Sequence, residues 1–215
     1  MKGCIMKKKP GKKRKRRQKK TRTIEPIRNM KVVQGIENML HSQKNYRDWI
    51  LWIFGLNTAL RISDLLSLKI NDVFDSNMQA REFIYINYSK RKNKKVVKII
   101  LNDKLKKSLA EYMEWRLQNN IYSEWLFYSK RNQDNPTDRH QVYRNMQQWA
   151  KTFNINQAIG THTLRKTWGY IAFKYFHIPI ELICEKLHHT HPAVTRRYLG
   201  ITDDMLEQVE KRVQI

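Results

Sequence analysis

Cysteines are few in this sequence, and long hydrophobic runs are missing. The two cysteines, Cys4 and Cys184, lie far apart in a chain of 215 residues, so neither a disulfide framework nor a CxxC metal motif is predicted, which fits a reducing compartment. The N-terminus is basic but lacks the apolar stretch of a signal peptide. The most apolar segment, Trp49 to Leu60, contains Asn57 and is much shorter than the roughly 20 residues that span a bilayer. Secretion and membrane insertion are therefore not expected.

Negative charge is also scarce. Lysine and arginine number 43 against 19 aspartates and glutamates, which gives a formal net charge of +24 and a pI near 10.1. The segment from Lys2 to Arg22 holds 13 of the basic residues and no acidic one, so the rest of the chain still carries +11. This excess predicts a polyanionic partner, with double-stranded DNA as the leading candidate. An RNA-binding or ribosome-associated protein would have a similar composition.

Residues 1–23 form a basic tail with almost no apolar side chains. Eleven of the 14 residues from Lys7 to Lys20 are lysine or arginine, so the tail cannot bury enough surface to offset its ordering entropy and is expected to be disordered when free. It is either a solvated tail without a specific role or a non-specific DNA tether that acts through counterion release. The DNA contacts predicted in it are Lys12, Lys13, Arg14, Arg16 and Arg17.

Residues 24–215 are predicted to form one mainly α-helical domain with a small antiparallel β-sheet. Apolar residues recur at helical spacing from Lys31 onward and through most of the chain after Leu105, including a stripe that ends at Phe176. Between Glu82 and Leu101 the pattern changes to two β-rich runs joined by a Lys-Arg-Lys-Asn-Lys-Lys turn, which predicts a hairpin with a basic tip. The predicted DNA contacts of this hairpin are Lys90, Arg91, Lys94 and Lys95.

Three short segments hold the candidate chemical groups. Thr58 to Leu68 places Arg61 between an apolar helix and a leucine-rich one, and His162 and Arg165 are spaced to share one helical face. The segment from Leu187 to Leu199 contains three histidines, two arginines and one tyrosine. Each segment alone is ambiguous, because an isolated arginine is more often a cap or an ion-pair partner.

The three histidines raise the question of a metal site. Cys184 and His188 lie four residues apart with His191 nearby, but no acidic or second cysteine ligand completes a zinc site, so no metal is predicted. For His189 considered alone, a hydrogen-bonded structural histidine is the ordinary expectation.

Taken in order, the segments resemble the tyrosine recombinases of the lambda-integrase superfamily. The family pattern is T-G-L-R-x-S-E-L-x-x-L, then H-x-L-R, then L-G-H, with a nucleophilic tyrosine nine residues after the last histidine. His189 and Tyr198 have that separation here. The ordered set is far more specific than any member, and the resemblance covers about residues 24 to 215. It implies the recombinase catalytic-domain fold and the catalytic set Arg61, Lys92, His162, Arg165, His189 and Tyr198.

The sequence departs from this pattern without removing a functional side chain. Ala59 and His188 stand where the family has glycine, and Asp64 stands where glutamate is frequent. The hairpin lysine of the family is best matched by Lys92 when the strands are aligned backwards from Leu101. Its neighbouring lysines remain alternatives: Lys90, Lys94 and Lys95.

The resemblance implies that Tyr198 attacks a DNA phosphate and forms a covalent phosphotyrosyl bond. Phosphoryl transfer needs positioning and neutralisation of charge, which the guanidiniums of Arg61 and Arg165 would supply. His162 would exchange a proton with the tyrosine. His189 would hydrogen-bond a phosphate oxygen.

Two further side chains complete the implied site. Lys92 would protonate the departing 5′-hydroxyl, and Asp64 would orient the arginines and the histidine. No metal, nucleotide or other cofactor is predicted, because the phosphotyrosyl bond itself stores the energy for rejoining and the chain has no Walker motif.

The ends of the chain bear on its partners. Family members usually carry an upstream helical DNA-binding domain, whereas here only the basic tail precedes residue 24 and is expected to substitute for it in part, through its charge. A last helix from Asp203 to Val213 has one apolar stripe. It either packs on its own core or, by resemblance, docks onto a neighbouring protomer in a DNA-dependent dimer or tetramer. A cytoplasmic, nucleoid-associated protein with no membrane partner is expected.

Two alternatives share this fold. A catalytically silent DNA-binding protein would use the basic surface alone, but the intact candidate side chains speak against it. A type IB topoisomerase uses the same tyrosine chemistry without exchanging DNA partners, and the sequence does not separate it from a recombinase.

Overall fold

The structure is a computed structural model that describes residues 23–88, 95–201 and 211. Most of the basic tail, including its five predicted DNA contacts, lies outside the described residues, as does the predicted last helix apart from Lys211. The hairpin tip also lies outside them, with Lys90, Arg91, Lys92 and Lys94. Lys95 is described only as the first residue of a strand.

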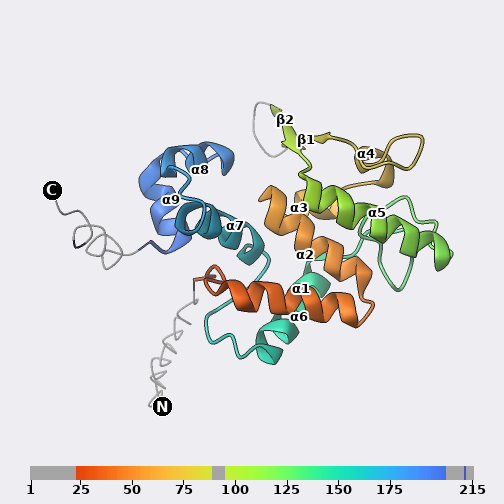
Figure 1. Cartoon of the computed structure of the whole chain (residues 1–215), viewed down its shortest axis with the longest axis horizontal. Helices are drawn as coiled ribbons and strands as arrows, with labels where there is room; N and C mark the ends of the chain where they lie inside the picture. Colours follow the sequence, from red (N-terminus) through yellow and green to blue (C-terminus); the bar gives the residue numbers. More distant parts are fainter. Residues whose placement is uncertain (1–22, 89–94, 202–210, 212–215) are drawn as a thin grey trace, which may run out of the picture.

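The described chain is mainly helical with a two-stranded antiparallel sheet, as predicted from the sequence (Figure 1). In β1 and β2, Phe83 pairs with Ile100 and Tyr88 pairs with Lys95. None of the described helices is long and apolar enough to cross a membrane. The elements are α1 Met30–Ser42, α2 Tyr46–Thr58, α3 Ile62–Leu66, α4 Ile70–Val73, β1 Phe83–Tyr88, β2 Lys95–Ile100, α5 Asp103–Gln118, α6 Arg139–Thr152, α7 Thr163–Lys174, α8 Ile180–Lys186 and α9 Pro192–Leu199.

Helix α2 is the centre of the main hydrophobic core. Every residue from Arg47 to Gly55 is buried, because α1, α5 and α7 pack around this helix. The Trp52 ring packs edge to face against the Trp149 ring of α6, with 5.6 Å between the ring centres. The apolar segment that is too short to span a membrane is thus part of a buried core helix, as its composition indicates.

A second, smaller hydrophobic cluster joins α7, α8 and α9, which lie together on one side of the molecule (Figure 1). It contains Ala172, Ile183, Leu187 and Leu199. Helix α7 belongs to both cores, because its first turn also places Leu164 in the main one. The junction between the two cores is therefore held by α7.

Two glycines allow α7 to approach its neighbours closely. A Cβ added at Gly55 of α2 would lie 2.6 Å from Leu164, and one added at Gly169 of α7 would lie 2.6 Å from Leu199 of α9. Real Cβ atoms do not come this close, so a larger residue at either position would force the contacting leucine side chain or its helix to shift. Glycine at these two positions therefore allows α2, α7 and α9 to pack closely.

The predicted apolar stripe of α7 is wrong at its end. Helix α7 stops at Lys174, and Phe176 beyond it is 70% exposed instead of buried. The chain turns there through His177, whose φ is +53°, and the Ile178 amide donates back to the Ala172 carbonyl at 3.0 Å. Helical spacing continues in the sequence past this turn, so periodicity alone could not locate it.

Candidate active site

Arg165 ties three elements together at the junction of the two cores. It lies in the first turn of α7 and is only 3% exposed. Its Nη1 donates to the Ala59 carbonyl at the end of α2, and its Nη2 donates to the Leu187 carbonyl at the end of α8, both at 2.5 Å. Carbonyls at helix C-termini lack intrahelical donors and carry partial negative charge, so a guanidinium suits this position.

Arg61 lies two residues after Ala59, at the N-cap of α3. Helix α2 ends there because Ala59 adopts the left-handed conformation, with a φ of +57°. This turn starts α3 at once and holds the half-buried Arg61 at the same junction as Arg165. The prediction that Arg61 stands where one helix gives way to another is confirmed.

Asp64, in the first turn of α3, is half-buried in the field of both arginines. Its Oδ1 accepts from the Ser63 hydroxyl at 3.4 Å. Desolvation raises the pKa of Asp64, and the positive charges of Arg61 and Arg165 oppose that rise. The carboxylate is thus placed to influence the two arginines, although its predicted orienting role is not shown by this arrangement.

His189 and Tyr198 meet in the smaller cluster. The His189 Nδ1 is hydrogen-bonded to the Thr195 hydroxyl at 2.9 Å. The His189 ring packs edge to face against the Tyr198 ring, with 4.8 Å between the ring centres. Thr195 is fully buried on α9, one helical turn before Tyr198. Because Nδ1 is engaged, Nε2 is the ring nitrogen left for another partner.

The surroundings of Tyr198 keep its hydroxyl protonated at neutral pH. Burial is the largest cause and raises its pKa, while Arg165 and Arg61 lower it. The ammonium of Lys166 lies over the tyrosine ring, 4.5 Å from its centre. Three cations are thus gathered around one half-buried phenol.

His162 occupies the N-cap of α7, before the helix that carries Arg165. Desolvation lowers its pKa, and nearby positive charges lower it further, those of Arg139, Arg165, Arg61 and Lys166. The pKa of His189 is lowered by the same means, with desolvation again the largest cause. Both imidazoles are therefore neutral at neutral pH.

The structure brings together most of the residues that the sequence predicts. Arg165 and Arg61 act on the pKa of each of the other described candidates, which are Asp64, His162, His189 and Tyr198. Lys92 lies outside the described residues. In the described parts of the chain, no three histidine, cysteine, aspartate or glutamate side chains are grouped to hold a metal ion.

Three cations at the site were not found from the sequence. Lys166 is 7% exposed and lies over Tyr198, Lys186 of α8 has its pKa lowered by desolvation and by Arg165, and Arg139 of α6 acts on His162. Lys166 directly follows Arg165 within an apolar helix, which was a usable signal. Arg139 and Lys186 had no comparable signal in a chain this basic.

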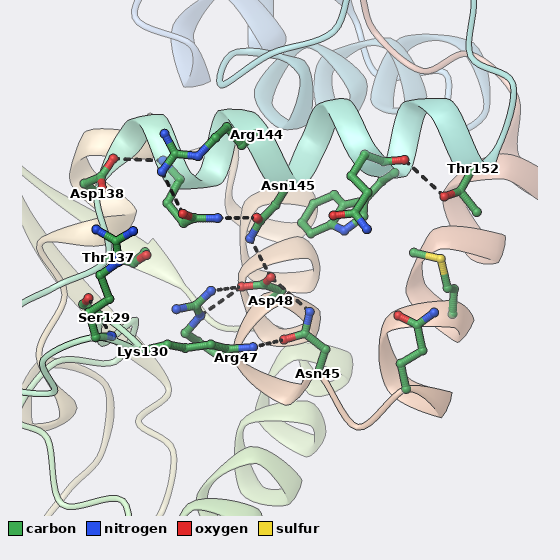
Figure 2. Close-up of a pocket in the computed structure, with 16 residues that line it drawn as sticks. Asn45, Arg47, Asp48, Ser129, Lys130, Thr137, Asp138, Arg144, Asn145 and Thr152 are labelled. Carbon is green, nitrogen blue, oxygen red and sulfur yellow. Dashed lines mark hydrogen bonds and ion pairs between the residues drawn. The ribbon is translucent and has the colours of Figure 1, made fainter.

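A polar cavity of about 440 Å³ lies apart from these residues, among α1, α2, α6 and the loop before α6 (Figure 2). At its floor, Asp48 accepts from Arg47 at 2.7 and 2.9 Å, from Asn45 at 3.0 Å and from Asn145 at 2.7 Å. Arg47 also donates to the Tyr128 carbonyl at 3.1 Å. No described catalytic candidate lines this cavity. The hydrogen bond from Asn145 to Asp48 thus holds α6, whose first residue is Arg139, against the central helix α2.

Comparisons with known proteins identify the family of the chain. The sequence model described as "Phage integrase family" matches residues 11–205, which is most of the chain. The chain belongs to the phage integrase family. This membership assigns the chain to DNA recombination, in agreement with the resemblance found in the sequence.

One curated relative is close in length to this integrase family member. "Probable integrase/recombinase YoeC" of Bacillus subtilis (strain 168) is 38% identical over 184 residues, covering 84% of this chain and 92% of that protein. Two crystal structures share the fold, each with a TM-score of 0.67. XerA recombinase is 22% identical and XerH, bound to a palindromic difH substrate after cleavage, is 20% identical. This chain is matched over 91% and 90% of its length but spans only 68% of XerA and 54% of XerH.

Proposed function

We propose that this phage integrase family member is a site-specific recombinase that cleaves and rejoins DNA through a 3′-phosphotyrosyl intermediate on Tyr198. One observation carries the proposal: the buried Arg165 and its neighbour Arg61 act electrostatically on a half-buried tyrosine that packs against His189. Such a pocket favours a phosphate that gains charge as it is attacked.

In the proposed cleavage step, the Tyr198 oxygen attacks the phosphorus of the scissile phosphate. A bond forms between that oxygen and phosphorus, and the bond to the 5′-oxygen of the next nucleotide breaks. Arg165 and Arg61 neutralise the phosphate oxygens, and the neutral His189 donates a hydrogen bond to one of them. Rejoining is the reverse reaction, in which a 5′-hydroxyl attacks the phosphotyrosine.

Two protons must move in this step. The pKa of Tyr198 is raised, so its proton has to leave during the attack, and His162 is proposed to accept it because its lowered pKa keeps it neutral. Lys92 is proposed to protonate the 5′-oxygen that departs. Asp64 is proposed to hold Arg61 and Arg165 in position.

The DNA partner is supported by charge. The chain has a net charge of +24, and a lambda integrase structure of the same fold is bound to DNA. The basic tail and the hairpin lysines and arginine are proposed to contact the phosphate backbone. A homo-oligomer that forms on DNA through the C-terminal helix is proposed because exposed apolar side chains lie on α8 and just before it, namely Leu182, Phe176 and Ile178.

The deciding experiment is covalent trapping. Incubation with nicked suicide duplexes that contain candidate sites, without divalent ions, should give an SDS-resistant protein–DNA adduct, and Tyr198→Phe should give none. Bound DNA without an adduct in the wild type would favour a catalytically silent DNA-binding protein. An adduct combined with relaxation of supercoiled plasmid but no strand exchange would favour the activity of a type IB topoisomerase.

A further inference from the structure

An open groove of about 440 Å³ runs between strand β2 and helix α8. Its lining residues come from two elements that are distant in the sequence and join next to the catalytic candidates: Val96, Val97, Lys98, Leu182, Glu185, Lys186 and His188. His188 directly precedes His189, and Lys186 directly precedes Leu187, whose carbonyl accepts from Arg165. The groove therefore borders the residues that position Arg165, and the Arg165 charge acts on Lys186 in its wall.

A lysine lies on each wall of the groove. Lys98 lies on the exposed face of β2, with its ammonium 3.9 Å from the centre of the Phe83 ring, and Lys186 lines the groove from α8. Glu185 is the acidic residue of the lining. Lys186 is half-buried and lies within reach of the Arg165 charge, so its ammonium is less hydrated than that of a surface lysine. A partly desolvated ammonium beside a second cation gains from an anionic ligand.

His188 occupies a backbone conformation that favours glycine. Its φ is +50°, and it ends α8 in the same way that Gly200 ends α9. In both helices the amide of this residue and the amide of the next residue donate to carbonyls of the last helical turn. Other non-glycine residues of this chain also adopt positive φ, so strain alone assigns nothing. What distinguishes His188 is that its side chain lines the groove with Lys98 and Lys186.

We propose that this groove binds a backbone phosphate of the DNA strand, adjacent to the phosphate that Arg61 and Arg165 hold, through Lys98, Lys186 and His188. The proposal rests on the proposed function, since it needs DNA in the active site. Each strand of a duplex presents a phosphate about every 3.4 Å along its axis, so lysines beside the proposed active site lie where a neighbouring phosphate would pass. The groove fixes the register of the strand relative to Tyr198.

The test measures binding of a labelled non-specific duplex by fluorescence anisotropy at several salt concentrations, using the full chain. Lys186→Met and Lys98→Met should each reduce the slope of log K against log salt by up to about 0.9, the value for one lost phosphate contact. The matched control is Lys107→Met, an exposed lysine on α5, which should keep the wild-type slope. Slopes equal to that of the control in both variants would overturn the proposal.

His188→Gly separates binding from folding. Glycine relieves the left-handed strain, so the Tm should rise, while duplex affinity should fall; a rise in Tm with unchanged affinity would remove His188 from the site. Lys98 is exposed, so its variant tests the groove even if a change at Lys186 impairs folding.

Adduct formation is measured in a separate assay, so that the groove and the catalytic proposal can fail independently. A lowered slope in Lys186→Met without any wild-type adduct would keep the groove and reject the catalytic proposal, whereas a wild type that does not bind duplex would reject both.

Discussion

At the scale of single residues, two buried arginines have different roles. Arg165 is held by carbonyls at the ends of α2 and α8, which positions its charge for a ligand. Arg47 is held by Asp48, with side chains 4% and 8% exposed, and so serves the fold. The same residue type thus serves the fold where its buried charge meets a carboxylate, and is proposed to bind the phosphate where its charge is held only by carbonyls.

Removal of the Asp48 carboxylate should destabilise the fold strongly. Asp48→Ala leaves the buried Arg47 charge unpaired and removes the acceptor of Asn45 and Asn145, so the free energy of unfolding should fall by about 3–5 kcal/mol in urea denaturation. As a control, Glu124→Gln removes the exposed ion pair with Lys69 and should change it by less than about 1 kcal/mol. Equal effects of the two changes would contradict the structural role of the cavity network.

The lowered pKa of His162 predicts the pH dependence of cleavage. A depressed pKa keeps the imidazole neutral to lower pH than a free histidine, so the single-turnover rate of adduct formation should stay level from pH 8 down through 6.5 and fall only below it. The His162→Gln variant should be slower and should lose this acidic limb. Persistence of the limb in that variant would assign it to another group, with His189 next in line because its pKa is also lowered.

At the scale of elements, the close contact between α7 and α9 sets the position of Tyr198. Gly169→Ala would place a methyl group against Leu199, the residue after Tyr198. Overpacking costs about 1–3 kcal/mol, and the better helix propensity of alanine offsets about 1 kcal/mol of this. The net loss of stability should therefore be small. The rate of adduct formation should fall by a larger factor than the duplex affinity, because the methyl group displaces the residue next to Tyr198.

A matched control for that change is available in another helix pair. Gly35→Ala on α1 would meet Phe153 at the same 2.6 Å, but away from the catalytic candidates. It should lower the Tm to a similar degree and leave the rate of adduct formation per folded molecule unchanged. If both variants slow cleavage equally, the α7 to α9 contact has no special part in placing the tyrosine.

At the scale of the whole molecule, the C-terminal residues should decide assembly. A chain truncated after Ile201 lacks the predicted helix from Asp203 to Val213, and its apolar stripe could no longer cover a neighbouring protomer. Sedimentation of protein–DNA complexes should then show monomers where the full chain forms dimers or tetramers. Unchanged assembly would indicate that the stripe packs on its own chain.

The sequence alone determined the family, the fold class and the order of the catalytic candidates. Helical spacing and two β-rich runs gave the elements because local periodicity follows directly from which side chains face the core. The motif spacing selected Arg61, Arg165 and Tyr198 as candidates because the ordered set is far more specific than any one of its members. Element ends were less predictable, as Phe176 shows.

Only the tertiary structure decided which charges act together. Arg165 reaches the Ala59 carbonyl across 106 residues of sequence, and Lys166 reaches the ring of Tyr198. The directions of the pKa shifts, the buried network at Asp48 and the groove at Lys186 have the same origin. Burial and electrostatic fields depend on distance in space, and packing of helices that are remote in the sequence sets that distance.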